Sequence, residues 1–281
     1  MKNSKEKLMI GWHHILGMTF TDFYFYSSFR VDLERELKYP QYIDILILEG
    51  SEGDKIENPP DGLENLRKYN LITYKSIRQP LDSWALDELI CYYVLFRKIL
   101  SLPLKYPIPI SEFNLIGIAT RFPQKLNKEE TLEYSKKGVY KLKRGEHTIK
   151  IIVTSQTPKK PENAIWQMFS GNPEKIIEGL SNYNWNRDDY KHLVLQQLIH
   201  KYKSEGVKMP YTEKDFFRDT LGYYIRSASI EDILKYKKTE DILKGIKPED
   251  VFKNYKPEDV FKNYKPEDIL KGLKAINLKI D

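Results

Sequence analysis

Two short apolar stretches that each contain one ionisable residue constrain the fold of this chain most strongly. Residues 43–48 read Ile-Asp-Ile-Leu-Ile-Leu, and residues 70–76 carry Lys75 near their end. Both stretches have the composition of buried β-strands, in which a charged side chain costs free energy unless it has a partner. Asp44 and Lys75 therefore either form a structural ion pair or lie at the edge of a functional cleft.

The flanking segments predict an α/β fold. Residues 8–26 are apolar and aromatic-rich, which predicts a helix, and residues 29–34 alternate with period two, which predicts a strand in an antiparallel hairpin with the Asp44 strand. Asp82 fits the N-cap of a helix that ends near residue 100, and residues 113–121 predict another buried strand. A strand, a helix and a strand in this order favour a parallel crossover with the helix packed on the sheet.

The second half of the chain becomes helical. Residues 138–143 and 148–155 predict a second hairpin, and from Pro161 onward the pattern is that of helices. We therefore expect three parts: an α/β domain over 1–160 with a mixed sheet flanked by helices, a helical region over 161–228 packed on it, and a tail over 229–281.

The tail repeats every nine residues. A Glu-Asp pair recurs in five units, and the units 247–255 and 256–264 are identical. Nine residues advance a helix by about 2.5 turns, so the apolar pairs of one long helix would alternate between opposite faces. Three of the units have a proline that fits the first helical position, namely Pro248, Pro257 and Pro266, which favours a series of short helices instead. Such units stack on a partner, so the region 229–273 is either a spacer or a surface for self-association or protein docking.

Composition excludes several classes of protein. With 46 Lys and Arg against 40 Asp and Glu, the net charge of +6 permits an anionic partner without arguing for one. The single cysteine, Cys91, cannot form an internal disulfide and lies in an apolar run, so we expect a buried thiol. No apolar run approaches the roughly 20 residues that span a bilayer, and residues 1–7 begin no signal peptide. We expect a cytoplasmic protein with no membrane contact.

Strand parity brings the candidate site residues together. Thr73 and Lys75 are two residues apart and share one face of their strand, and Asp44 on a neighbouring strand can join them. A separate basic group, with Tyr140 among it, surrounds the second hairpin. It is either a patch that tracks nucleic-acid phosphates or a solvated strand face, and its residues include Lys141, Lys143 and Arg144.

The order of elements and a series of short motifs along nearly the whole chain resemble a known family. They are similar to the Rpn family of recombination-promoting nucleases and transposase-related proteins, within the PD-(D/E)xK superfamily, and in particular to a cyanobacterial group with a nonapeptide tail. The motifs are Gly11-Trp12-His13, Thr21-Asp22-Phe23, Leu71 to Ser76, Trp84 to Leu89, Thr120-Arg121-Phe122-Pro123 and Met209-Pro210-Tyr211-Thr212.

This resemblance implies a PD-(D/E)xK-like fold and Mg²⁺-dependent cleavage of phosphodiester bonds. Asp44 then binds the metal and Lys75 orients or deprotonates the attacking water. Glu88 and Tyr92 fall where many superfamily members carry Gln-x-x-x-Tyr. Where the family pattern has a carboxylate, this chain has the neutral Thr73, a weak Mg²⁺ ligand.

Another acid therefore completes the site, or the site is inactive. The candidates for the missing carboxylate are Glu34 on the adjoining strand and Asp22 on the first helix. The leading function is a Mg²⁺-dependent DNA endonuclease linked to mobile elements or genome defence. The alternatives are an inactive relative that binds DNA or protein through its tail, and an unrelated protein in which Asp44 and Lys75 form a structural pair.

Overall fold

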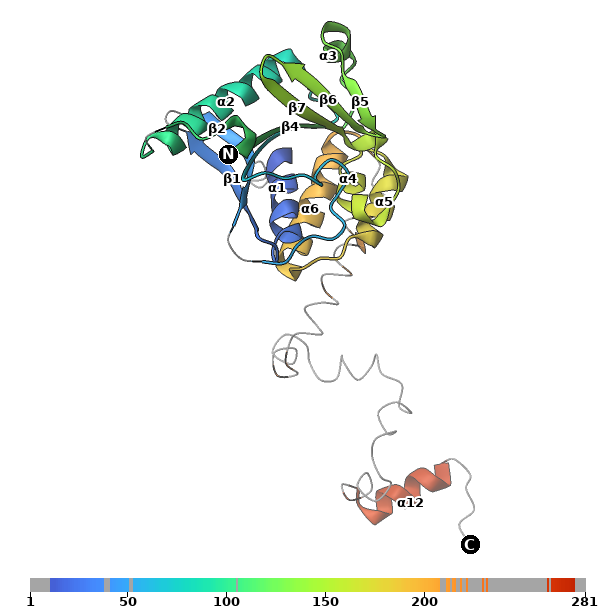
Figure 1. Cartoon of the computed structure of the whole chain (residues 1–281). Coiled ribbons are helices and arrows are strands. Elements are labelled where there is room, and N and C mark those ends of the chain that lie inside the picture. The colour runs from blue at the N-terminus through green and yellow to red at the C-terminus, as the bar shows by residue number, and fades with distance from the viewer. Residues whose placement is uncertain are drawn as a thin grey trace, which may run out of the picture. The chain divides into compact units, whose positions relative to one another are not determined.

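A computed structural model describes residues 11–37, 41–50, 53–104, 106–207 and 264–275, together with scattered residues between 211 and 262. The side chains of residues 34–37, 41 and 272–275 are not among those described. The chain divides into two compact units, Met1–Arg218 and Asp219–Asp281. The first unit contains the whole sheet (Figure 1).

The sheet has seven strands in the order β1-β2-β3-β4-β7-β6-β5. The pairs β3–β4 and β4–β7 are parallel, and every other neighbouring pair is antiparallel, so the predicted mixed sheet is confirmed. In that spatial order the strands are β1 (Phe29–Leu37), β2 (Gln41–Glu49), β3 (Tyr69–Lys75), β4 (Phe113–Ala119), β7 (His147–Val153), β6 (Val139–Arg144) and β5 (Glu133–Lys136).

Helices cover both faces of the sheet, because its central strands are apolar on both sides. Four helices and the sheet residues Ile45 and Ile72 share one hydrophobic cluster. Figure 1 shows these helices gathered on one side of the sheet. They are α1 (Trp12–Phe23), α4 (Ala164–Met168), α5 (Pro173–Asn182) and α6 (Asp188–Ser204). The region 161–204 therefore completes the core of the α/β unit.

The opposite face is covered by α2 (Ser83–Ser101), whose apolar side chains share a second cluster with Leu46 and Leu71. Asp82 is the predicted N-cap, and its carboxylate accepts a hydrogen bond from the backbone N–H of Ala85 at 3.0 Å. Because α2 connects the parallel strands β3 and β4, the predicted crossover is confirmed. A shorter helix, α3 (Gln124–Glu129), adds Leu126 to the same cluster.

Some expectations require correction. Cys91 is exposed, because Leu86, Leu89, Tyr93 and Phe96 define the buried face of α2 and position 91 lies off that face. The edge strand β5 was not predicted, since it buries no side chain and therefore gives no period-two signal. Three short 3₁₀ segments were also missed: η2 (Ile110–Glu112), η3 (Thr154–Gln156) and η4 (Pro161–Asn163).

The second unit contains one described helix, α12 (Pro266–Ala275). It begins at Pro266 and has Glu267 and Asp268 in its first turn, as the repeat pattern predicts for one unit. Pro248, Pro257 and the predicted boundary after residue 228 lie outside the described residues.

A buried polar network fixes the loop between β2 and β3. The Asn163 side chain accepts from Asp61 N at 2.9 Å and donates to Asp61 Oδ2 at 2.6 Å, and Trp166 Nε1 donates to Asp61 O at 2.9 Å. Lys136 donates to Asp61 Oδ1 at 2.6 Å and also pairs with Glu64. Burial raises the pKa of Asp61, but the hydrogen bonds from Lys136 and Asn163 outweigh burial and hold it below its ordinary value.

Removing Asn163 should destabilise the first unit. Asn163→Ala leaves the Asp61 N–H and one carboxylate oxygen unpaired in a buried site, so we expect the free energy of unfolding to fall by about 2 to 4 kcal/mol. Denaturant unfolding of the full chain measures this loss. Asn184→Ala, at an exposed asparagine, is the control and should stay near wild type. Equal stabilities of the two variants would contradict the role assigned to the network.

Candidate functional site

Asp44, Thr73 and Lys75 lie on the sheet face that α2 covers. In the β2–β3 pairing Ile45 is opposite Ile72, and both side chains belong to the cluster beneath α1. Side chains alternate along a strand, so the residues on either side of these two belong to the opposite face. The predicted neighbourhood of Asp44 and Thr73 is confirmed by a hydrogen bond between their side chains.

The Asp44 carboxylate is oriented by two donors on the same oxygen. Its Oδ2 accepts from Thr73 Oγ1 at 2.9 Å and from the backbone N–H of Tyr74 at 3.2 Å. Among the described residues, neither a third hydrogen bond nor an ion pair to Asp44 is formed, so Asp44 and Lys75 are not a structural pair. Asp44 is only half-buried, so Oδ1 is left to bind a ligand.

Helix α2 adds a carboxylate and a phenol to this group. Burial raises the pKa of Tyr92, and the charges of Glu88 and Asp44 raise it further. Glu88 is itself held by Trp84, whose Nε1 donates to Glu88 Oε1 at 3.1 Å. Tyr92 therefore stays protonated at neutral pH and remains a hydrogen-bond donor.

Glu34 remains a candidate for the missing carboxylate only because of its position in the β1–β2 register. Its backbone lies in β1 between Leu33, which is opposite Ile45, and Arg35, which is opposite Ile43. This position is level with Asp44 in the neighbouring strand. The Glu34 side chain lies outside the described residues.

Asp22 is not brought to Asp44. It is fully buried at the end of α1, in contact with Tyr183 of the cluster on the other face of the sheet. Its Oδ2 accepts from Tyr183 Oη at 2.9 Å and its Oδ1 accepts from the backbone N–H of Arg187 at 2.7 Å. Burial raises the pKa of Asp22, partly offset by these hydrogen bonds. In the structure Asp22 attaches the loop after α5 to α1 and is not placed beside Asp44, so its assignment to the metal site stays a prediction.

The donor set fits a magnesium ion only in part. Mg²⁺ prefers hard oxygen ligands and keeps several waters, so one or two carboxylates can bind it. The described residues supply Asp44 and Glu88 near Tyr92 and the neutral hydroxyl of Thr73. Within the described part of the chain, no group of three His, Cys, Asp or Glu side chains is arranged to hold a metal ion.

Arg144 has a structural role in place of the predicted contact with nucleic acid. Its guanidinium, 15% exposed, donates to the Glu130 carboxylate at 2.8 Å, to Asp87 Oδ1 at 2.6 Å and to Ser83 O at 3.1 Å. These contacts join the end of β6 to the start of α2 and to the end of α3. No local sequence pattern predicts the contacts with Ser83 and Asp87, because these partners lie 61 and 57 residues away in the chain. Lys141 and Lys143 are exposed.

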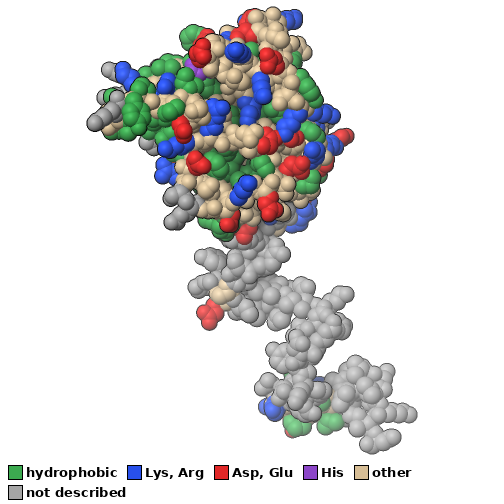
Figure 2. Space-filling model, viewed as in Figure 1, with side chains coloured by type: hydrophobic (Ala, Val, Ile, Leu, Met, Phe, Trp, Pro, Cys, Tyr) green, Lys and Arg blue, Asp and Glu red, His purple; other side chains and the backbone are tan. Residues whose placement is uncertain are grey.

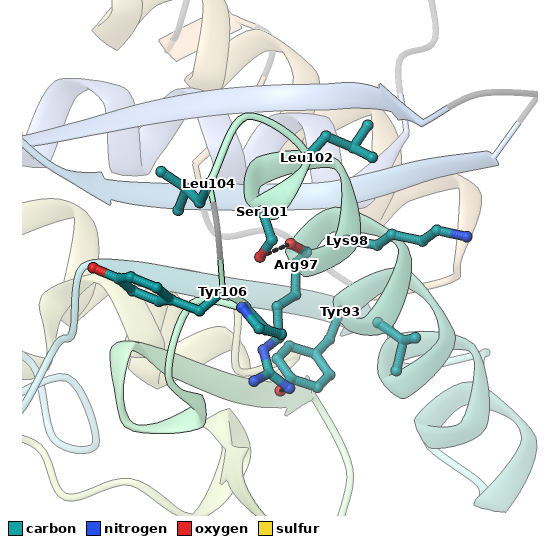
Figure 3. A pocket seen from close by; sticks show the side chains of 9 residues that line it. Tyr93, Arg97, Lys98, Ser101, Leu102, Leu104 and Tyr106 are labelled. Atoms are coloured by element: carbon teal, nitrogen blue, oxygen red, sulfur yellow. Dashed lines mark hydrogen bonds between the residues drawn. The ribbon is translucent and has the colours of Figure 1, made fainter.

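The described cavities lie away from Asp44. One of about 490 Å³ is formed at the C-terminal end of α2, where Leu102 and Tyr106 are exposed by 70% and 71%. In Figure 3 the Arg97 and Tyr93 side chains lie together at this cavity, and Arg97 Nη1 donates to Tyr93 Oη at 3.3 Å. Neither Asp44 nor Lys75 lines it.

Comparison with known proteins leaves the family open to test. No protein-family model, no curated protein and no solved structure matches this chain. None of the described helices has the length and apolar character needed to cross a membrane. The case for function therefore rests on the geometry around Asp44.

A carboxylate at position 73 should make folding respond to magnesium. Thr73→Glu places a second negative charge beside Asp44 Oδ2, which repels without a cation and binds one when it is present. We expect the Tm of Thr73→Glu to fall below wild type in chelator and to rise on adding Mg²⁺ by more than that of the neutral control Thr73→Gln. Identical Mg²⁺ shifts for the two variants would rule out a metal ligand position here.

Asp22 should contribute to the stability of the fold and not to the affinity for a divalent metal. In Asp22→Asn an amide faces the donors Tyr183 Oη or Arg187 N–H, so we expect a loss of about 1 to 3 kcal/mol in the free energy of unfolding. Divalent-metal affinity, measured by calorimetry on the folded variant, should match wild type. Asp188→Asn, an exposed acid next to the same loop, is the stability control. A stable variant with lost metal affinity would return Asp22 to the metal site.

Proposed function

We propose that this chain is a Mg²⁺-dependent DNA endonuclease of the PD-(D/E)xK type. The observation that carries the proposal is the oriented carboxylate of Asp44, held by Thr73 and by the Tyr74 N–H on the sheet face below α2. Lys75 follows two residues after Thr73 on the same strand. This is the order of an acid, a second ligand position and a lysine that the family resemblance implies.

Each residue then has a distinct role. Asp44 would hold the metal, and its Oδ2 is fixed by the two donors. The metal, when bound, offsets the negative charge that develops on the phosphate. Lys75, as an ammonium, would orient the attacking water and stabilise the negative charge that develops on its oxygen. Tyr92, whose pKa is raised, stays protonated and donates a hydrogen bond to a phosphate oxygen.

DNA as the substrate is supported by charge and by the resemblance. The net charge is +6, and Lys141 and Lys143 are exposed on β6. Figure 2 shows basic and acidic side chains interspersed over the face in view. DNA bound on that face would therefore contact individual lysines and arginines and not one continuous basic patch. A role in mobile elements or in genome defence follows from the resemblance alone.

A second candidate function is binding without catalysis. It is favoured by the neutral Thr73 and by the finding that, in the described part of the chain, no three metal-binding side chains come together. The tail would then supply the docking surface over residues 229–273. Its described helix α12 exposes Leu270 by 47%, an apolar side chain that a partner or a second copy can cover.

Plasmid nicking distinguishes the two functions. We expect the full chain to nick supercoiled DNA with Mg²⁺ and not with chelator, and Asp44→Asn and Lys75→Met each to lower the rate at least about a hundredfold. The control Lys125→Met changes a lysine that is 78% exposed and should leave the rate unchanged.

The binding function makes a different forecast. Wild-type protein would then retain DNA in an electrophoretic shift assay but nick it with neither Mg²⁺ nor Mn²⁺. Wild-type rates in folded Asp44→Asn and Lys75→Met would show that nicking, if present, arises at another site.

A further inference from the structure

Three basic side chains line a cavity at the end of the sheet that is opposite to Lys75. The cavity has a volume of about 390 Å³ and is lined by Arg67, from the loop before β3, by Lys141 of β6 and by Lys150 of β7. Thr148 and Glu146 also line it. Glu146 is the one acid among its lining residues, so the cavity carries an excess of positive charge.

The two lysines stand directly opposite each other. Lys141 and Lys150 are register partners in the antiparallel pair β6–β7, where like charges repel. Burial lowers the pKa of Lys150, and the charges of Lys136, Lys141 and Arg67 lower it further against the opposing effect of Glu64. Lys150 Nζ donates to the carbonyl oxygen of Gly62, which is neutral.

Nearby carboxylates are already engaged elsewhere. Glu64 pairs with Lys136, as does Asp61. Across the described residues, no carboxylate forms an ion pair with Arg67, Lys141 or Lys150. Glu146 lines the same cavity and Glu133 is opposite Lys141 in the β5–β6 pair, so the repulsion between these cations is only partly offset. An anion of about two negative charges would offset it further.

Arg67 is held in place before any ligand arrives. Its backbone N–H donates to Asn70 Oδ1 at 2.8 Å, and Asn70 Nδ2 donates to Arg67 O at 2.6 Å, with Asn70 fully buried. Its guanidinium donates through Nη1 to Phe113 O at 2.7 Å. The remaining guanidinium N–H groups suit a tetrahedral oxyanion, which arginine binds with paired donors.

This cavity is separate from the Asp44 site. It is lined by Asn114 and Thr148 at the starts of β4 and β7, whereas Lys75 pairs with Ala119 at the end of β4. Five residues of β4 separate the two levels, which is roughly 16 Å along the strand. The inference therefore stands without the proposed nuclease activity.

We propose that Arg67, Lys141 and Lys150 form a binding site for a phosphate group. The group is carried either by a small molecule with free phosphates or by the phosphorylated end of a DNA strand. Both sources present the same dianionic oxygens to the same three cations.

Calorimetric titration of the full chain with pyrophosphate, at constant ionic strength and without metal, tests the site. We expect saturable binding by wild type, with Lys141→Ala and Arg67→Gln each weakening it about tenfold or more. Lys125→Ala is the control, since Lys125 is 78% exposed and does not line the cavity. It should bind within about twofold of wild type.

A second arm identifies the source of the phosphate. A DNA duplex with 5′-phosphates competes with pyrophosphate better than the same duplex with 5′-hydroxyl ends if a DNA end is the ligand, and equally if a small molecule is. The proposal is overturned if wild type shows no saturable pyrophosphate binding, or if Lys125→Ala weakens binding as much as Lys141→Ala. Because Lys141 is exposed, its variant stays informative even if Arg67→Gln fails to fold.

Discussion

The central strands of this sheet are covered on both faces, and this constraint governs where polar groups can lie. In β3 the five residues between its first and last are all buried. A polar side chain in that run needs a partner supplied by the fold. Asn70 binds the backbone around Arg67, Thr73 binds Asp44, and Tyr74 Oη hydrogen-bonds Thr120 Oγ1 at 2.8 Å. These bonds fix Asp44 at the candidate site and the backbone of Arg67 beside the cavity of about 390 Å³.

The same constraint explains the two hydrophobic layers. Because β2, β3, β4 and β7 are apolar on both faces, neither α1 with the later helices nor α2 alone could cover the sheet. The residues 161–204 complete the hydrophobic layer that also contains α1. They therefore belong to the same compact unit as the sheet, although their sequence is entirely helical in character.

Sequence patterns predict those parts of the fold that depend on local chemistry. The cap at Asp82, the two hairpins and the parallel crossover through α2 each follow from residues within a short window. The exposed strand β5 does not, since none of its side chains is buried. Cys91 is exposed although it lies in an apolar run, because a helix buries only one stripe of its surface.

In the candidate site, too, local patterns predict some contacts and not others. Strand parity was enough to put Thr73 beside Asp44, but not to predict that Thr73 would donate to Asp44 while no ion pair to Lys75 forms. Tyr183, a partner of Asp22, lies 161 residues away, and Asp87, a partner of Arg144, lies 57 residues away, so no local pattern predicts these contacts. Arg67, Lys141 and Lys150 come together only through the sheet order.

The exposed position of Cys91 has a practical consequence. It is the single thiol of the chain, it lies on the outer surface of α2, and it precedes Tyr92 directly. A maleimide dye would therefore attach at one stoichiometric position without any engineered cysteine. Its emission would report on the water and charge around α2, so the native sequence already provides an optical reporter beside the candidate site.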